Sequence, residues 1–319
     1  MGPASAPSDD EPRIVPPKVT ASIANFGDYG VAMTAAAVHD VLAQRGPFSL
    51  KLMVIDDGSG PEVVERLRRT VPASVEVVAL ATNGGYATAC NAAIRRAAAD
   101  GSDRVWLLNN DLGLPPTTLL SLLEALESNP TWAAVAPATV SASVPDRVLG
   151  AGATLNLTRA RVRHLYQGRS VRDLPSHPYQ VQAVEGAAPL LRLQAVDSVG
   201  LFDEGYGMYW EDTDWSVRAR RRGWMLGVDP RARVEHRVSQ STSSEQRTEW
   251  MITNRIRISD KLGSPTQRFV FRLYFLLGWL PLYTVARLLP QYGVRTTFHL
   301  LGRLVRRSLR AASQSGTSR

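Results

Sequence analysis

The stretch Val105–Asp111 reads VWLLNND, four apolar residues followed by two amides and a carboxylate. A short apolar run that ends in polar turn residues predicts a buried strand. Open α/β sheets bind ligands at the carboxyl ends of their strands, so this strand would bring Asp111 to a ligand site. Mg²⁺ and Mn²⁺ prefer oxygen ligands, often one or two carboxylates plus phosphate oxygens, which makes Asp111 a candidate metal ligand. The same residues also fit a strand followed by an ordinary Asn/Asp turn.

The segments around this stretch alternate between strand and helix patterns. We expect strands over Val19–Asn25, Leu50–Ile55 and Val75–Leu80, and helices over Ala32–Leu42, Pro61–Arg69, Tyr86–Ala99 and from Pro115 to Glu127. Strands that alternate with helices of this length predict right-handed βαβ units. The fold class is therefore α/β, a Rossmann-like arrangement with a mostly parallel central sheet.

Four polar residues end successive predicted strands. They are Asn25, Asp56, Asn83 and Asp111. Because the carboxyl ends of parallel strands meet at one edge, we expect these side chains to converge there. The glycine-rich turn at Asn83 does not spell the dinucleotide fingerprint, and no Gly-Lys-Ser or Gly-Lys-Thr is present, which argues against oxidoreductase and P-loop functions.

A second acidic segment follows much later in the chain. Glu211, Asp212 and Asp214 fall in the first turn of a predicted helix that becomes basic towards Arg222. The helix dipole favours this arrangement, and capping alone explains one or two of the acids. The flanking tryptophans offer flat surfaces that suit a site holding a ring. From 138 to 178 the pattern weakens into loops and short strands, and short strands recur at 228–230 and 234–236.

Composition restricts the class of protein. The chain has 319 residues, of which 44% are hydrophobic, enough for a sizeable core. Its single cysteine, Cys90, excludes an internal disulfide framework and a cysteine-based metal site, and fits a reducing, cytosolic compartment. We expect residues 1–17, rich in Pro, Ala, Ser and acids, to be a disordered lead that is neither a signal peptide nor an anchor.

The basic charge is confined to the tail. The formal net charge is +8, but ten Lys or Arg and no Asp or Glu lie from Lys261 onward, which leaves 27 basic and 29 acidic residues before it. The body of the protein is slightly acidic and pairs no basic stripe with exposed aromatic residues. Nucleic acid is therefore not an expected partner.

The tail itself is predicted to be helical and amphipathic. Leu273–Ala286 is an apolar run of 14 residues, shorter than the ~20 needed to cross a bilayer, so we expect it to be buried or interfacial. At about 100° per residue, an apolar face and a basic face separate, and Leu300 belongs to neither. The apolar face holds Val294, Phe298, Leu301, Leu304, Val305 and Leu309, and the basic face Arg295, Arg303, Arg306, Arg307 and Arg310. Such a helix lies on an anionic membrane, or alternatively packs on the rest of the protein with its arginines solvated.

Taken in order, the motifs resemble those of the family-2 inverting, nucleotide-sugar-dependent glycosyltransferases, which have the A-type glycosyltransferase fold. The resemblance runs from Val19 to Asn254 and is nearest to the bacterial rhamnosyltransferase-like and galactofuranosyltransferase-like branch. The matching segments are Asn25–Gly27, Val54–Ser59, Asn83–Asn91, Asn109–Asp111, Gly200–Glu204, Glu211–Asp214 and His236. Taken alone, a single His such as His236 is more often structural than a ligand.

The resemblance implies a role for each motif. Residues implied in donor binding are Asn25, Phe26, Asp56, Asp57, Asn83, Gly85, Asn91 and Asn110. Mg²⁺ or Mn²⁺ would be bound by Asp111, Asn109 and His236. Asp212, supported by Glu211, would be the catalytic base, and Trp210, Asp214 and Tyr209 would contact the acceptor. Asp56 or Asp57 can accept the N3 hydrogen of uracil or thymine, which favours a UDP- or dTDP-sugar, dTDP-rhamnose among them.

Two positions depart from the family pattern. Asn109 is neutral where a carboxylate is usual, and Ala187–Arg192 contains Pro189 in place of the usual strand pattern. We expect a catalytic domain over 18–262, with a nucleotide-sugar-binding half (18–137) and an acceptor-binding half (138–262), and a basic amphipathic tail over 263–319.

The implied function is sugar transfer to a hydroxyl of a glycan or lipid-linked acceptor in cell-wall or surface polysaccharide synthesis. The enzyme would be cytoplasmic and peripheral at the inner face of the membrane. The alternatives are an inert scaffold with the same fold and a nucleotidyltransferase.

Overall fold

The computed structural model describes residues 16–237 and 244–315, with side chains up to residue 303. Residues 1–15 of the expected disordered lead lie outside the described part, as do the side chains of the predicted tail faces beyond Arg303.

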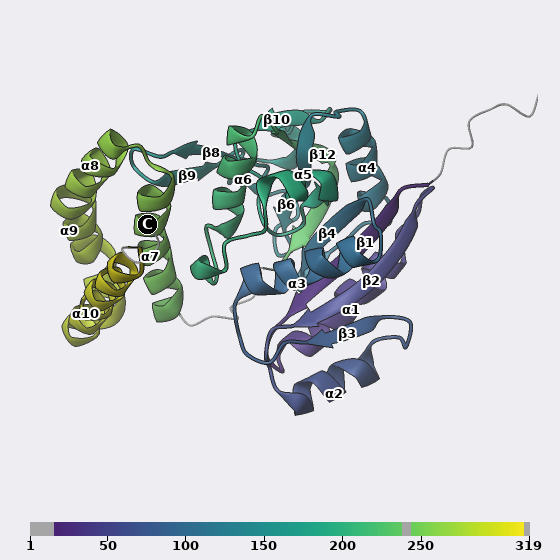
Figure 1. The fold of residues 1–319 in the computed structure, drawn as a ribbon, viewed down its shortest axis with the longest axis horizontal. Coiled ribbons are helices and arrows are strands. Elements are labelled where there is room, and N and C mark those ends of the chain that lie inside the picture. Colours follow the sequence, from purple (N-terminus) through teal and green to yellow (C-terminus); the bar gives the residue numbers. More distant parts are fainter. Residues whose placement is uncertain (1–15, 238–243, 316–319) are drawn as a thin grey trace, which may run out of the picture.

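A single large sheet forms the centre of the molecule (Figure 1). Its strands are β1 (Lys18–Asn25), β2 (Ser49–Asp56), β3 (Glu76–Ala79), β4 (Arg104–Asn109), β5 (Leu112–Gly113), β6 (Trp132–Ser141), β7 (Val148–Gly150), β10 (Tyr179–Val181), β11 (Leu190–Arg192) and β12 (Met225–His236). The main order is β10-β12-β6-β11-β4-β1-β2-β3. β1 pairs in parallel with β2 and β4, β2 with β3, and β6 with β12, whereas β11 runs antiparallel between β4 and β6. The predicted α/β class with a mostly parallel sheet is confirmed.

Helices cover both faces of the sheet. They are α1 (Gly30–Leu42), α2 (Pro61–Thr70), α3 (Tyr86–Ala99), α4 (Thr118–Glu127), α5 (Leu193–Val199) and α6 (Glu211–Arg221). Successive strand residues point to opposite faces, so Leu52 and Val54 join a core with α1, α2 and α4. Met53 and Ile55 join a second core with α3, α5 and α6. Both faces are buried, which is why these strands are continuous apolar runs.

The acceptor-side strands differ from the sequence prediction. β6 is a buried strand of ten residues, whereas loops and short strands were expected from 138 onward. Its sequence, WAAVAPATVS, is rich in Ala and contains Pro137, and both residue types are depleted in strands. β12 is one strand of twelve residues and not two short ones. Its pairing with β6 shifts between Asp229 and Arg233, and this irregularity accommodates Pro230.

A small hairpin and four helices form a second group beside the central sheet (Figure 1). They are β8 (Ala153–Asn156), β9 (Arg161–His164), α7 (Ser244–Leu262), α8 (Pro265–Leu273), α9 (Leu280–Tyr283) and α10 (Leu289–Ser315). π-helical turns at Tyr274–Trp279 and Thr284–Leu288 join α8, α9 and the start of α10, and the backbone then bends at Gly293 inside α10, where φ is +73°. Figure 1 shows these helices, green to yellow, beside α7 and away from the sheet.

An aromatic column holds this group together. Phe271, Phe275, Trp279 and Tyr283 recur every four residues, with neighbouring ring centroids 5.2, 5.2 and 4.5 Å apart. A π turn contains more residues than an α turn, so mixing the two keeps residues four apart on one line. The guanidinium of Arg255 on α7 lies over the Trp279 ring at 4.2 Å and donates to the Ala160 carbonyl. The column therefore binds the tail to α7 and to the β8–β9 hairpin.

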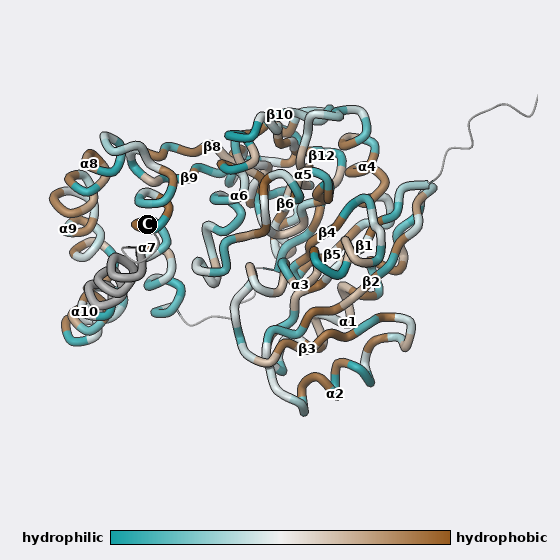
Figure 2. Tube along the Cα trace, viewed as in Figure 1, coloured by the Kyte–Doolittle hydropathy of each residue, from teal (hydrophilic) through white to brown (hydrophobic). Residues whose placement is uncertain are grey.

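The outer surface of the tail is apolar and exposed. Exposed residues there are Phe269, Val270, Leu273, Leu276, Leu277, Leu282, Val285, Val294 and Phe298. Leu277 is 78% exposed, and hydrophobic residues, drawn brown in Figure 2, recur along α8 and α9. By length and composition alone, the helical residues Pro265–Arg303 are long and apolar enough to cross a membrane. Little of their most apolar part is buried in the protein. The apolar helical part is thus longer than Leu273–Ala286, the run on which the expectation of a buried or interfacial helix was based.

Candidate functional site

The strand ends meet at one edge of the sheet, as the sequence predicts. Asn25 at the end of β1 pairs in register with Asp56 at the end of β2. Ala24 pairs with Asn109 at the end of β4, two residues before Asp111. The candidate donor and metal residues therefore share one edge.

A buried hydrogen-bond network links Asn25 and Asp56. The Asn25 amide donates to Asp56 Oδ2 at 2.8 Å and accepts from the Thr34 hydroxyl at 2.8 Å. Asp56 also accepts from the Ser59 hydroxyl at 2.7 Å and the Ser59 N–H at 2.9 Å, and the Ser59 hydroxyl accepts from the Gly27 N–H. Asp56 is fully buried. Its carboxylate shapes the loop after β1, so of the two expected nucleobase acceptors Asp56 is already engaged within the protein.

Asp57 holds the glycine turn before α3. Its two oxygens accept from the N–H groups of Gly84 and Gly85 at 2.9 and 2.8 Å. Burial raises the pKa of Asp57, and these two N–H groups act in the opposite direction. Gly85 has φ +87°, and a Cβ there would lie 2.3 Å from the Gly207 carbonyl oxygen. Only glycine fits this close approach, whereas Asn83 is exposed at the turn.

Two other predicted donor residues are engaged inside the protein. The Asn91 amide donates to the Phe202 carbonyl at 2.9 Å and to Glu204 at 2.8 Å, and accepts from the Phe202 N–H. Asn91 therefore joins α3 to the segment before α6 and does not line an open surface. The Asn110 amide lies 3.2 Å from the Thr34 hydroxyl, on the network that also holds Asn25. Phe26, in contrast, is 42% exposed at the donor edge.

Asp111 and His236 form the candidate metal site. Leu112 on β5 pairs with His236 on β12, which brings His236 Nε2 to 3.2 Å from Asp111 Oδ1. Asp111 is 4% exposed. A carboxylate oxygen and an imidazole nitrogen this close fit two neighbouring ligands of one divalent cation. In the described part of the chain no group of three or more His, Cys, Asp or Glu forms a metal site, so phosphate oxygens and water would complete the coordination.

Two carboxyl groups with different surroundings begin α6. Glu211 is buried, and its Oε2 has no hydrogen-bond partner among the described residues. Burial and the adjacent Asp212 carboxylate raise the pKa of Glu211 well above its usual range. Asp212 accepts from the Gly186 N–H at 2.9 Å and the Thr213 N–H at 2.6 Å. Burial raises the pKa of Asp212, whereas these donors and His164 act in the opposite direction. The hydrogen bonds to Asp212, and their absence at Glu211 Oε2, therefore favour the ionised form at Asp212 and the protonated form at Glu211.

The turn before this pair is strained and clamped. Tyr209 and Trp210 have φ values of 68° and 77°, a region that costs about 1–3 kcal/mol for a residue other than glycine. The Asn254 side-chain amide, on α7, donates to the carbonyls of Tyr206, Met208 and Tyr209 at 2.8 to 2.9 Å. Trp210 is only 8% exposed and lies in the core shared with α7. Of the predicted acceptor residues, Tyr209 alone keeps a half-buried surface.

Asp214 forms buried ion pairs that the sequence does not indicate. It is fully buried, and its oxygens lie 2.7 Å from Arg218 Nε and 2.8 Å from Lys261 Nζ. The Tyr206 hydroxyl donates to it at 3.3 Å. Asp214 therefore ties α6 to α7 from a fully buried position.

We expect Asp214→Ala to lower the free energy of unfolding by about 3 kcal/mol, because breaking a buried ion pair leaves charges uncompensated. Urea denaturation followed by circular dichroism measures this change. The exposed pair of Lys51 and Asp100 is the control, since Asp100→Ala should cost less than about 1 kcal/mol. Equal effects of the two substitutions would contradict a structural role for Asp214.

Three residues at the site were not identified from the sequence. Thr34 and Ser59 complete the Asn25–Asp56 network. His164 lies in the region interpreted as loops, and its Nδ1 is 2.8 Å from Glu185 Oε1. A lone His in a weakly patterned region carries no sequence signal, because its partner is 21 residues away and meets it only in the fold.

Comparison with known proteins agrees with this geometry. Residues 30–177 match the family described as Glycosyl transferase family 2. Residues 30–177 therefore form a glycosyltransferase family 2 domain. The family resemblance inferred from the motifs is confirmed, and the next comparison is consistent with its rhamnosyltransferase-like branch. The chain is 28% identical over 222 residues to N-acetylglucosaminyl-diphospho-decaprenol L-rhamnosyltransferase from two strains of Mycobacterium tuberculosis, which covers 64% of this chain and 71% of the relative.

Solved structures identify the fold of this glycosyltransferase domain. The structure of GalNAc-T7 with UDP, GalNAc and Mn²⁺ superposes with a TM-score of 0.57 and 15% identity over 84% of this chain. This chain spans 58% of the length of that protein. The mannosyltransferase PcManGT from Pyrobaculum calidifontis, in complex with GDP-Man and Mn²⁺, superposes with a TM-score of 0.56 and 17% identity over 98% of this chain and 87% of its own. The predicted A-type glycosyltransferase fold is confirmed.

Proposed function

We propose that this glycosyltransferase is an inverting enzyme that transfers a sugar, rhamnose from dTDP-rhamnose being the first candidate, to a hydroxyl of a lipid-linked glycan. The nearest support is the mycobacterial relative, whose name specifies L-rhamnose and an N-acetylglucosaminyl-diphospho-decaprenol acceptor. The product would serve cell-wall or surface polysaccharide synthesis.

The segment Glu185–Ala187 is the main support for the proposal, because it connects the candidate base on α6 with the end of β4. The Gly186 N–H donates to Asp212 at 2.9 Å, and the next residue, Ala187, accepts from the Asn109 N–H at 2.9 Å. The candidate base is therefore tied directly to the end of β4, next to the candidate metal ligand Asp111. A base beside a diphosphate-binding edge is what in-line sugar transfer requires.

The proposed reaction divides the work between these groups. The Asp212 carboxylate takes the proton of the acceptor hydroxyl as the oxygen attacks the anomeric carbon from the face opposite the leaving nucleoside diphosphate. A divalent cation held by Asp111 and His236 would act as a Lewis acid that stabilises the diphosphate charge. Glu211, kept protonated by its buried position, adds no second negative charge. Inversion at the anomeric carbon follows from the single displacement.

Donor recognition is assigned to the edge of β1 and β2. Phe26 is an exposed aromatic ring there and suits stacking on a nucleobase. Asn25 and Asp56 would act by holding the loop, and Asn83 and Gly85 by forming the turn that Asp57 grips. Asp57 remains the candidate acceptor for the N3 hydrogen of uracil or thymine.

The donor is tested with a panel of dTDP- and UDP-sugars. We expect dTDP-rhamnose with Mn²⁺ to raise the melting temperature most and to be consumed with a short-chain N-acetylglucosaminyl-diphospho-polyprenol. Release of a nucleoside diphosphate would support sugar transfer. Release of inorganic diphosphate would instead identify a nucleotidyltransferase, and donor binding without any turnover would identify an inert scaffold.

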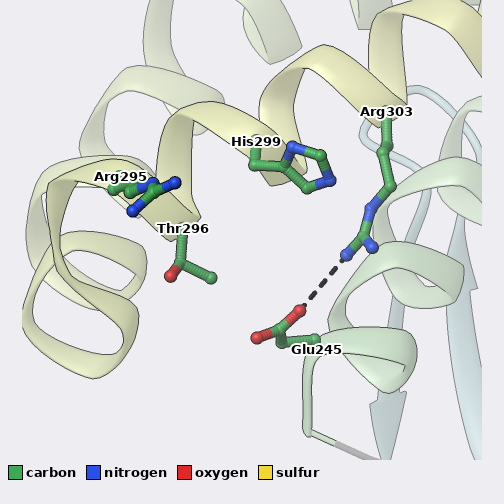
Figure 3. A pocket seen from close by; sticks show the side chains of 5 residues that line it. All are labelled: Glu245, Arg295, Thr296, His299 and Arg303. Carbon is green, nitrogen blue, oxygen red and sulfur yellow. Dashed lines mark hydrogen bonds and ion pairs between the residues drawn. The ribbon is translucent and has the colours of Figure 1, made fainter.

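A peripheral membrane position is part of the proposal. The exposed side chains Leu277, Leu282 and Phe298 form a surface that water would not favour and that lipid would cover. Arg295, His299 and Arg303 line a recess of about 680 Å³ between α10 and α7 (Figure 3). Arg303 pairs with Glu245 there at 3.3 Å, whereas Arg295 is exposed and lies beside Val294. Apolar residues with neighbouring cations suit the interface of an anionic cytoplasmic membrane leaflet.

The membrane surface is tested with the triple variant Leu277→Gln, Leu282→Gln, Phe298→Gln. We expect it to lower binding to phosphatidylglycerol vesicles by about 1,000-fold, because each of the three large apolar side chains contributes on the order of 1.5 kcal/mol or more when buried in lipid. Flotation assays measure the bound fraction. Leu42→Gln, on the exposed face of α1, is the matched control and should bind normally. Unchanged flotation of the triple variant, or resistance of the wild type to carbonate extraction, would contradict peripheral binding.

A further inference from the structure

His164 and Glu185 form a partly exposed ion pair near Glu211 and Asp212, the two acids at the start of α6. His164 Nδ1 lies 2.8 Å from Glu185 Oε1, and Glu185 Oε2 accepts from the Thr139 hydroxyl at 3.0 Å. Glu185 immediately precedes Gly186, whose N–H donates to Asp212. The pair therefore belongs to the same short segment that holds the candidate base.

The surroundings leave a place for the Glu185 side chain. A Cβ on Gly150 would lie 1.8 Å from Glu185 Oε1, so glycine alone allows the carboxylate to occupy this position. The Thr139 hydroxyl also bonds the Gly150 carbonyl at 3.0 Å. Strands β6, β7 and β9 thus each contribute to one arrangement, in which the Glu185 side chain is 16% exposed and the His164 side chain 42%.

We propose that His164, oriented by Glu185, is a positioning residue for sugar transfer, whose positive charge holds Asp212 in its proton-accepting form. This inference rests on the proposed function, since it assigns a partner to the proposed base. His164 reaches the site on the β8–β9 hairpin, and its open edge leaves it accessible to solvent protons.

The charges around the two groups support this assignment. Glu185 and Asp212 raise the pKa of His164, with the Glu185 hydrogen bond the largest cause. In return, His164 acts to lower the pKa of Asp212. The other titratable groups near Asp212 are Glu211 on α6 and Tyr86 and Cys90 on α3. Burial raises the pKa of both Tyr86 and Cys90, so these two stay neutral, and His164 is a cation that acts to lower the pKa of Asp212.

The sign of the effect on catalysis follows. A base works only when ionised, so activity falls as the pH drops through the pKa of Asp212. Loss of the His164 cation would raise that pKa and move the acidic limb of the pH profile towards higher pH. A lysine at position 164 would keep the positive charge, so the acidic limb of the pH profile would stay where it is in the wild-type protein.

The first measurement needs no activity. The chain has five histidines, so spectra of protein labelled with ¹³C at histidine Cε1 resolve His164, identified by its absence in His164→Gln. We expect its titration midpoint to lie above the usual value of about 6.5 and to fall in Glu185→Gln and in Asp212→Asn. An unchanged midpoint in Asp212→Asn would overturn the electrostatic link, whether or not the protein transfers sugar.

The second measurement uses kcat against pH with dTDP-rhamnose and the polyprenol acceptor. We expect His164→Gln to lose about 10-fold at the acidic end and little at high pH, and His164→Lys to restore the wild-type limb. His39→Gln is the matched control, because His39 also faces a carboxylate, Asp40, but is 84% exposed and far from Asp212 in the fold. A uniform loss at every pH that His164→Lys does not restore would indicate a structural role and overturn the proposal.

Discussion

Asp212→Asn is expected to lower kcat by about 1,000-fold and to leave donor affinity within a factor of about two. An amide has nearly the shape of a carboxylate but cannot take the acceptor proton, and general-base catalysis contributes about 10²–10⁴-fold. Steady-state transfer assays give kcat, and calorimetry with the nucleoside diphosphate gives the donor affinity.

Glu211→Gln is the matched control for the base. Because Glu211 is the protonated member of the pair, a neutral amide mimics it, and we expect less than about a 5-fold change in kcat. A large loss in Glu211→Gln with a mild effect in Asp212→Asn would exchange the two roles. Lost donor binding in Asp212→Asn would make Asp212 a structural or metal residue.

Removal of the metal ligand is expected to be as severe. Asp111→Ala should lower transfer by at least about 1,000-fold, because a bound cation contributes several kcal/mol to charge stabilisation at the leaving group. EDTA should abolish the activity of the wild-type protein, and Mn²⁺ or Mg²⁺ should restore it. Neither ion should rescue Asp111→Ala.

Asn109→Ala separates the two neighbouring positions. Asn109 carries no charge, so we expect its loss to weaken metal activation by about 10-fold or less. Full activity of the metal-free wild-type protein would refute a metal role for Asp111 and His236. An Asn109→Ala variant as inactive as Asp111→Ala would show that the amide is an obligatory ligand.

The donor half of the fold was predictable because its elements are local patterns. The helix Tyr86–Ala99 has the predicted bounds, since the glycine turn starts it and its alanines favour it throughout. β6 could not be predicted, because four of the ten residues of WAAVAPATVS are Ala and one is Pro, which are depleted in strands. It is a strand because β11 and β12 pair with it on either side, and that pairing is not visible in the segment itself.

The candidate site was predicted in position but not in the partners of its residues. The ends of the predicted strands indicated that Asn25, Asp56 and Asp111 lie at one edge of the sheet, because the carboxyl ends of parallel strands share an edge. The hydrogen bonds of Asn91 to Phe202 and of Asp214 to Lys261 join segments 111 and 47 residues apart, and no local pattern encodes them.

The tail illustrates the same limit. The sequence predicts an apolar face through Val294 and Phe298, and both are exposed, at 64% and 68%. Leu300, outside that face, is the residue buried against the protein. Periodicity identifies the members of a face but not what covers it.

The clamp formed by Asn254 determines where this enzyme can be shortened. α7 precedes the exposed helices, and its Asn254 amide holds three carbonyls of the strained turn that leads into Glu211. Lys261, in the last turn of the same helix, neutralises the buried Asp214. A protein cut after β12 would lose both, and the turn at Tyr209 and Trp210 would relax towards ordinary backbone angles. A soluble form that keeps the acid pair in place should therefore retain the chain through Leu262, with the apolar helices beyond it replaced by polar sequence.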